Sequence, residues 1–117
     1  MTTNGVMRVH HTSTSEGEWD GPKAESRLVD DPRALRRVFA FVDREEPENK
    51  TDAKFPHHMV SKRGAVGAAS VRACVNGIAI LNGGRGGANI NDRDRRGVYK
   101  HLAAHVRDAG REPADLD

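Results

Sequence analysis

The chain has 117 residues, a length that fits a single domain. Hydrophobic residues make up 36% and charged residues 31%, and aromatic residues are few, so we expect a compact centre with polar extensions. The single cysteine excludes an internal disulfide, and no apolar run approaches the ~20 residues of a membrane span, so no membrane partner is expected.

The N-terminal residues 1–18 are polar, rich in Ser and Thr, and without helical periodicity. We expect an extended arm here, disordered in isolation, in which the stretch VMRVH can form a short strand if a partner supplies a sheet edge. The expected organisation is this arm, a globular domain over residues 19–110, and a polar tail over residues 111–117.

Two short elements follow the arm. Asp20 or Gly21 can cap a helix over residues 22–29 that opens with Pro22, and Trp19 lies where it can anchor that helix. Asp31 and the proline after it predict a second helical turn, which passes into a strand at residues 38–43 because this stretch is β-branched and aromatic.

The second half of the globular domain is expected to be mostly helical. Residues 54–60 form a second extended segment that can pair with residues 38–43 as a hairpin, and Pro56 confines it to an edge. Apolar spacing predicts a helix over residues 66–81 that ends near Gly83. Asn89 or Asn91 can cap a last helix over residues 91–109, whose predicted buried face is Val98, Leu102, His105, Val106 and Ala109. The predicted fold is α+β and mainly helical, with three or four short helices and a small β-hairpin.

The glycine-rich stretch LNGGRGGANI, residues 81–90, raises the question of a phosphate-binding loop. It lacks the Lys-Ser/Thr pair of a P-loop, Asn89 stands at the third glycine position of a dinucleotide fingerprint, and a helix pattern precedes it. We therefore interpret it as a connector between helices whose glycines adopt positive φ, with Arg85 presented to a partner.

The histidines raise the question of a metal site. Pairs occur at residues 10–11 and 57–58, and His101 and His105 share one helix face. Zinc remains an alternative, but the chain has no paired ligand spacing such as C-x-x-C. His57 and His58 should point to opposite sides of a strand, and His101 should be exposed while His105 borders the core. The expectation is that no metal or other cofactor is bound.

Catalysis and nucleic-acid binding are both weakly supported. Cys74 lies in the apolar stripe of a helix, where thiols are usually inert, and no serine has a nucleophile-elbow context, so an enzyme is not expected. Residues 61–117 carry a net charge of +4, but acidic residues interrupt the basic run RDRR at residues 93–96 and no aromatic platform stands nearby. Nucleic acid is therefore not an expected partner.

The order of segments resembles a known family. It runs WDGPKAESRL, FAFVD, AKFPHHMV, a small-residue helix, and then GGRGGANINDRDRRGVYKHLAAH, over residues 19–109. The most telling pieces are Trp19-Asp20-Gly21, Lys54-Phe55-Pro56-His57, and Gly83 to Gly87 followed by a helix with Tyr99, His101 and Leu102. This resembles a small capsid-associated domain of tailed phages, found with prohead protease and other head-morphogenesis modules. The protease module itself is absent, so no protease activity is implied.

The resemblance implies a head decoration or minor capsid protein that binds the major capsid protein, with possible self-association on the shell. It would be located in the virion, and in the host cytoplasm during assembly. The alternatives are an assembly factor that leaves the capsid and a small nucleic-acid-binding regulator. The arm and the basic positions supply the expected capsid contacts, which are Val6, Met7, Arg8, Val9, Arg85, Arg93, Arg95 and Arg96.

Overall fold

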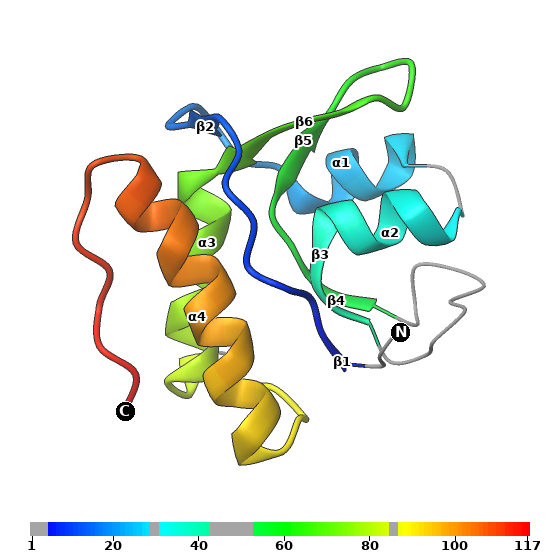
Figure 1. Cartoon of the computed structure of the whole chain (residues 1–117). Coiled ribbons are helices and arrows are strands. Elements are labelled where there is room, and N and C mark those ends of the chain that lie inside the picture. Colours follow the sequence, from blue (N-terminus) through cyan, green and yellow to red (C-terminus); the bar gives the residue numbers. More distant parts are fainter. Residues whose placement is uncertain (1–4, 29–30, 43–52, 85–86) are drawn as a thin grey trace.

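The computed structural model describes residues 5–28, 31–42, 53–84 and 87–117, and shows an α+β fold (Figure 1). The described helices are α1 (Gly21–Arg27), α2 (Pro32–Val38), α3 (Val71–Leu81) and α4 (Asp92–Asp108). The described strands are β1 (Gly5–Val6), β2 (Thr14–Ser15), β3 (Phe39–Val42), β4 (Ala53–Pro56), β5 (His58–Val60) and β6 (Val66–Ser70).

Each of these helices begins at a side-chain cap, which satisfies one of the free N–H groups of the first turn. The backbone N–H three residues further on donates to Asp20 at 3.0 Å, to Asp31 at 3.1 Å, to Ser70 at 3.1 Å and to Asn91 at 2.8 Å. The expected caps at Asp20, Asp31 and Asn91 are confirmed. The first and last helices begin and end within two residues of the expected positions.

The strands form two three-stranded sheets, ordered β1-β3-β4 and β2-β6-β5. The expected pairing of residues 38–43 with residues 54–60 is present as the antiparallel pair β3–β4. The segment of residues 54–60 is divided between the two sheets, however, because the strand is interrupted at His57. Its first half, β4, pairs with β3, whereas its second half, β5, pairs with β6 in the other sheet. The antiparallel pair β3–β4 is thus only one part of a larger strand arrangement.

The predicted helix over residues 66–81 is wrong in its first third. Residues 66–70 form strand β6, which pairs antiparallel with β5 and parallel with β2, and the helix begins only after the cap Ser70. The small residues of this stretch fit a helix locally, but strand pairing on both sides overrides that preference.

The N-terminal segment is extended, as expected, but it is part of the globular fold rather than a separate arm. Strand β1 pairs with β3, and the Met7 amide donates to the Ala40 carbonyl at 2.9 Å. Strand β2 pairs with β6. Between these two strands the segment passes between α4 and the strands β3 and β5 (Figure 1). The N-terminal segment was expected to pair with a sheet edge of a partner, but it pairs with strands β3 and β6 of its own chain.

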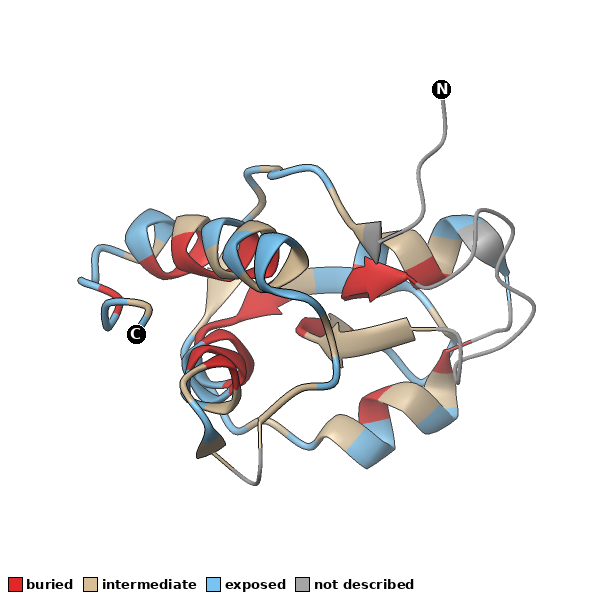
Figure 2. Ribbon diagram, turned by 90° about the horizontal axis from the view of Figure 1, so that it is seen from below, coloured by how far each residue is buried: buried red, intermediate tan, exposed pale blue. Residues whose placement is uncertain are grey.

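Two groups of buried side chains form the core. The first lies between β3, α3 and α4 and includes Ile78 and Leu102, and the second lies between α1, α2 and β3 and includes Leu35 and Phe39. The buried faces of α3 and α4 turn toward each other, with exposed residues on their outer sides (Figure 2). Their approach is close, because a Cβ built on Gly77 would lie 2.7 Å from Leu102 Cδ1. Trp19 is half-buried against the second group.

The glycine loop and the C-terminal tail connect to these helices. Gly83 and Gly87 have φ of 101° and 81°, which confirms the connector role, while Arg85 lies outside the described residues. The tail is polar, as expected, but it is attached to the domain. The Tyr99 hydroxyl donates to the Ala114 carbonyl at 2.8 Å, and the Asp117 amide donates to Asn82 Oδ1 at 2.8 Å.

Candidate metal centre

Five of the six histidines come together in the interior. They arrive from three parts of the chain: the N-terminal segment, the break between β4 and β5, and helix α4. Their ring centroids are mostly 4.6 to 5.2 Å apart, with a longer separation of 6.4 Å between His10 and His57. Four of the residues are at most 1% exposed and the fifth is half-buried. The five are His10, His57, His58, His101 and His105.

The local backbone explains why these side chains converge. His101 and His105 are four residues apart in α4 and therefore lie on one face of that helix. His57 belongs to neither strand, and this break removes the alternation that would have separated it from His58. The two rings lie 4.6 Å apart, so the expectation that they point to opposite sides is wrong. The expected exposure of His101 is also wrong, because it is 1% exposed.

Three backbone carbonyls determine which nitrogen of three rings carries the proton. Nδ1 of His57 lies 3.0 Å from the Phe55 carbonyl, Nδ1 of His58 lies 2.8 Å from the Gly67 carbonyl, and Nδ1 of His101 lies 3.1 Å from the Met7 carbonyl. A carbonyl oxygen only accepts hydrogen bonds, so each Nδ1 must donate. In a neutral imidazole this leaves Nε2 with an unshared electron pair.

These electron pairs face other ring nitrogens. His57 Nε2 lies 3.1 Å from His101 Nε2, and both atoms are acceptors when the rings are neutral. Two acceptors at this distance repel unless a cation lies beside them. His58 Nε2 lies 3.2 Å from His10 Nε2, and this second contact can be an ordinary hydrogen bond if His10 carries its proton on Nε2. The first contact has no such solution for neutral rings.

His105 adds a further polar group without a partner. Both of its ring nitrogens are buried and make no hydrogen bond to the described residues. Leaving such a group unsatisfied costs about 1–3 kcal/mol. A bound cation would satisfy the free electron pair of this ring together with those of its neighbours.

Burial keeps the rings neutral. It lowers the pKa of His58 and of His101 to about 4, and that of His105 to about 3. The pKa of His57 is held well below its usual value by burial and then by the imidazoles of His58 and His101, and partial burial lowers the pKa of His10. Neutral imidazole is the form that binds metal ions, and metal binding does not first have to displace a proton here.

The ligand geometry fits one ion. His10, His57, His58 and His105 each offer one nitrogen, and these four atoms all lie within 4.8 Å of one another. Tetrahedral zinc with Zn–N bonds of ~2.0–2.1 Å needs nitrogens ~3.4 Å apart, so the rings need to close by about an ångström. His101, whose Nε2 lies 3.1 Å from that of His57, is a fifth candidate ligand. Cys74 does not take part, because it lies in the core of α3, where burial raises its pKa to about 12.

The expected capsid contacts among the described residues differ in exposure. Val6 and Met7 are half-buried in the fold. Arg95 is engaged internally, since it donates to the Leu81 and Asp117 carbonyls at 3.0 and 2.6 Å. Arg96 is paired with Asp92 at 2.8 Å but exposed. Three further candidates are also exposed, namely Arg8, Val9 and Arg93.

Comparisons with protein families, with curated protein sequences and with solved structures gave no match. Within the described part of the chain, no helix is long and apolar enough to cross a membrane. The function is therefore argued from the geometry of the histidine cluster. The sequence raised these residues as a possible zinc set but did not show that they meet. The signal of the cluster in the sequence was the recurrence of paired histidines, but their separations match no standard ligand spacing.

Proposed function

We propose that the protein binds one transition-metal ion at the histidine cluster. The observation that carries this proposal is the contact between His57 Nε2 and His101 Nε2 at 3.1 Å, where both Nδ1 atoms face backbone carbonyls. Metal-bound histidines commonly donate their other N–H to a carbonyl, which orients the ring toward the ion. Here three of five rings have that support.

The donor set selects the kind of ion. Imidazole nitrogen suits zinc, copper, nickel and iron, whereas calcium and magnesium prefer oxygen ligands. The ligand group found among the described residues consists of four histidines and includes no carboxylate. Zinc is the first candidate because four nitrogen ligands match its tetrahedral preference.

The role best supported for this ion is structural. The four most buried histidines are at most 1% exposed, which leaves little room for a substrate. The ligands come from the N-terminal segment, from the β4–β5 break and from α4, so one ion would hold three separate parts of the chain together. Closed sites with a full set of protein ligands contribute folding energy rather than catalysis.

The test is direct metal titration of the full chain after metal removal. Calorimetry with zinc sulfate should give one site per chain, and cobalt chloride should give the visible absorption of a tetrahedral nitrogen site. The variants His57→Ala and His105→Ala should each weaken zinc binding at least about tenfold, in line with the loss of a ligand.

The matched control is His11→Ala. His11 is adjacent to His10 but exposed, and its ring contacts Asp108 at 2.8 Å rather than the cluster. This variant should bind zinc as the unaltered chain does. Failure of the unaltered chain to bind zinc, cobalt, copper or nickel would refute the proposal, and so would equal zinc affinity in His11→Ala and His57→Ala.

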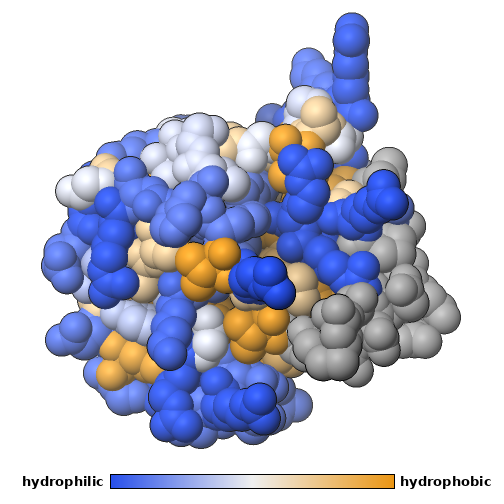
Figure 3. Space-filling model, viewed as in Figure 1, coloured by the Kyte–Doolittle hydropathy of each residue, from blue (hydrophilic) through white to orange (hydrophobic). Residues whose placement is uncertain are grey.

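We propose as a second function that the protein is a head decoration or minor capsid protein. The support is the resemblance over residues 19–109, together with the fact that two of its most telling residues, His57 and His101, lie in the histidine cluster. The visible face in Figure 3 is mainly hydrophilic with small separate apolar areas, which fits a partner held by scattered contacts rather than by one apolar surface. An assembly factor that leaves the capsid, and a nucleic-acid-binding regulator, remain the alternatives.

Mass spectrometry of purified virions tests this second proposal. Stoichiometric presence supports a structural role, and absence favours an assembly factor or regulator. A charge-reversal variant should change Arg93 and Arg96 only, because Arg95 holds the C-terminal tail and its loss would disturb the fold. Weaker, salt-dependent incorporation of the Arg93→Glu/Arg96→Glu variant is the expected result.

A further inference from the structure

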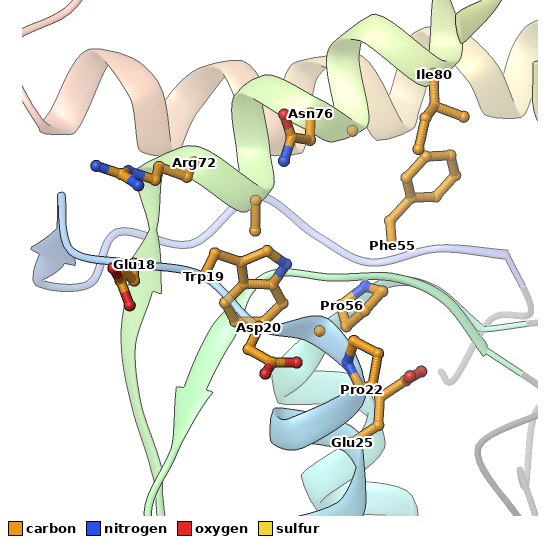
Figure 4. Close-up of a pocket in the computed structure, with 13 residues that line it drawn as sticks. Glu18, Trp19, Asp20, Pro22, Glu25, Phe55, Pro56, Arg72, Asn76 and Ile80 are labelled. Atoms are coloured by element: carbon orange, nitrogen blue, oxygen red, sulfur yellow. The ribbon is translucent and has the colours of Figure 1, made fainter. Parts of the chain in front are cut away.

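A cleft of about 790 Å³ lies between the start of α1, strand β4 and helix α3. Figure 4 shows Trp19 in its centre, with Arg72, Asn76 and Ile80 on the α3 side. Asp20, Pro22 and Glu25 lie on the α1 side. The cleft thus combines an aromatic ring with polar groups on both walls.

The charges of the cleft are unequal. Its lining includes three carboxylates, from Glu18, Asp20 and Glu25, against one guanidinium, that of Arg72. Glu18 and Glu25 form no ion pair with other described residues, and the Asp20 carboxylate caps α1 through one oxygen. In a chain whose overall charge is positive, this is a local negative site. It is complementary to a cation.

The aromatic groups favour the same ligand. A Lys or Arg cation is attracted to the face of a tryptophan, and the attraction increases with carboxylates close by. Trp19 also borders a second hollow of about 250 Å³, so the open surface continues past the indole. The lining of this hollow includes Lys23 and Arg27, so the excess of negative charge is confined to the first cleft. The combined length of the two hollows fits an extended peptide better than a small amine. Asn76 and Arg72 can donate to the carbonyls of such a peptide.

Phe55 ties the cleft wall to the rest of the fold. Its φ is 64°, a left-handed conformation that is strained for a bulky side chain. In this conformation its ring lines the cleft beside Gly77, while its carbonyl accepts from His57 Nδ1. Strain of this kind is concentrated at functional sites, and here it fixes an aromatic wall at the cleft.

We propose that this cleft binds a lysine- or arginine-bearing extended segment of a partner protein. Glu18 and Glu25 lie on opposite sides of Trp19 (Figure 4), so one cationic side chain of the segment would lie against the indole and Glu18, and a second would lie beside Glu25. The peptide backbone would run along α3 past Asn76. This site is separate from the metal proposal, because none of the histidine rings lines the cleft.

The test uses the fluorescence of Trp19, the only tryptophan in the chain. A tetra-arginine peptide blocked at both ends should shift its emission, and the effect should weaken as salt is raised. The double variant Glu18→Gln/Glu25→Gln should bind the peptide about tenfold more weakly, the size expected from two exposed charge contacts. Glu112→Gln, which is outside the cleft, should bind as the unaltered chain does.

The carboxylate variant also separates the cleft from the histidine cluster. Glu18 and Glu25 line the cleft and do not belong to the histidine group, so zinc titration of Glu18→Gln/Glu25→Gln should be unchanged while peptide binding weakens. The proposal is overturned if tetra-arginine causes no shift, if the carboxylate variant binds as tightly as the control, or if a blocked tetra-glutamine peptide binds equally well. Equal affinity for arginine amide and tetra-arginine would also overturn it, since the site would then be one for small amines.

Discussion

At the scale of single residues, replacing His105 tests whether its imidazole is a metal ligand or only fills space in the core. Both its nitrogens are buried without a hydrogen-bond partner among the described residues. In the metal-free protein, His105→Leu should therefore not destabilise the fold and should raise the free energy of unfolding by about 1 kcal/mol, because an unsatisfied polar group is removed. Stabilisation by added zinc should be lost in the same variant.

Urea denaturation with and without zinc sulfate measures both effects. If His105 has no role in metal binding, zinc should stabilise His105→Leu as much as it stabilises the unaltered chain. A loss of more than about 2 kcal/mol in the metal-free variant would mean that His105 packs in a way that leucine cannot replace.

The lowered pKa values of the cluster predict acid sensitivity of the metal-free protein. Above pH ~6.5 the rings are neutral in both folded and unfolded chains, so they make no difference to stability. Below pH ~6.5, these histidines take up protons in the unfolded chain. In the folded chain they stay neutral until the pH approaches their lowered pKa, which is about 4 for His58 and His101. Stability should therefore fall as the pH falls from 6.5 toward 4, by up to about 1.4 kcal/mol per pH unit for each ring.

Urea denaturation in the presence of a chelator at pH 7.5, 6 and 5 measures this slope. His58→Gln/His101→Gln should flatten the profile, because glutamine does not titrate. A free energy of unfolding that stays constant between pH 7.5 and pH 5 would show that the rings are accessible to protons in the folded state.

Single residues were also where sequence reasoning did best and worst. The helix caps Asp20, Asp31 and Asn91 were predictable because capping depends only on a residue and its next few neighbours. The histidine cluster was not, because His10 and His105 are far apart in sequence and nothing local indicates that they meet. Periodicity indicates which face a residue occupies and not what lies opposite that face.

At the scale of elements, the docking of β1 on α4 can be tested through Gly97. A Cβ built on this helix residue would lie 2.9 and 3.1 Å from the two methyl carbons of Val6. Alanine normally stabilises a helix interior by about 1 kcal/mol relative to glycine. Here Gly97→Ala should instead destabilise the protein by about 1–2 kcal/mol, because Val6 has to move.

The sign of this effect is informative. A freely moving N-terminal arm would leave Gly97 open, and alanine would then be stabilising. Gly97→Ala should cost little when it is made in the Val6→Ala variant, because the shorter side chain makes room for the new methyl group. The double variant Val6→Ala/Gly97→Ala should therefore be nearly as stable as Val6→Ala alone. Thermal unfolding of the four proteins completes the cycle, and a stabilising Gly97→Ala would contradict the observed docking.

Elements were predictable where one strong local signal sets them. The helix α4 has an amphipathic face and a cap, and its expected and observed bounds differ by one residue at each end. Residues 66–70 were assigned to the wrong element because their alanines and glycine allow either conformation, and the pairing of β6 with β2 and β5 decides between them. The register and partners of a short strand are tertiary properties that its own residues do not specify.

At the scale of the whole molecule, the N-terminal segment connects the two sheets. It adds one strand to each of the two sheets, through β1 and β2. At its ends these strands are only two residues long, and in its middle His10 enters the histidine cluster. Short strands contribute little pairing energy, so a metal ligand at the centre of the segment would be its main attachment.

Metal removal should therefore loosen this segment before it loosens the helices. By mass action, an ion bound at a concentration 100 times its dissociation constant stabilises the folded chain by about 2.7 kcal/mol. Hydrogen exchange should report where that stabilisation acts. With chelator, the amides of Met7, bonded to Ala40, and of Ala69, bonded to Ser13, should exchange at least about tenfold faster than with zinc. Amides within α3 should change less.

The control for this last prediction is again His11→Ala, which removes a histidine from the same segment without touching the cluster. Its exchange should respond to zinc and chelator as in the unaltered chain, whereas in His10→Ala the Met7 amide should exchange fast in both conditions. If chelation speeds exchange equally in α3 and in the N-terminal segment, the ion would stabilise the fold as a whole and not this attachment. If it changes neither, His10 is not a ligand, and the segment is held by its contacts with the two sheets and with α4 without an ion.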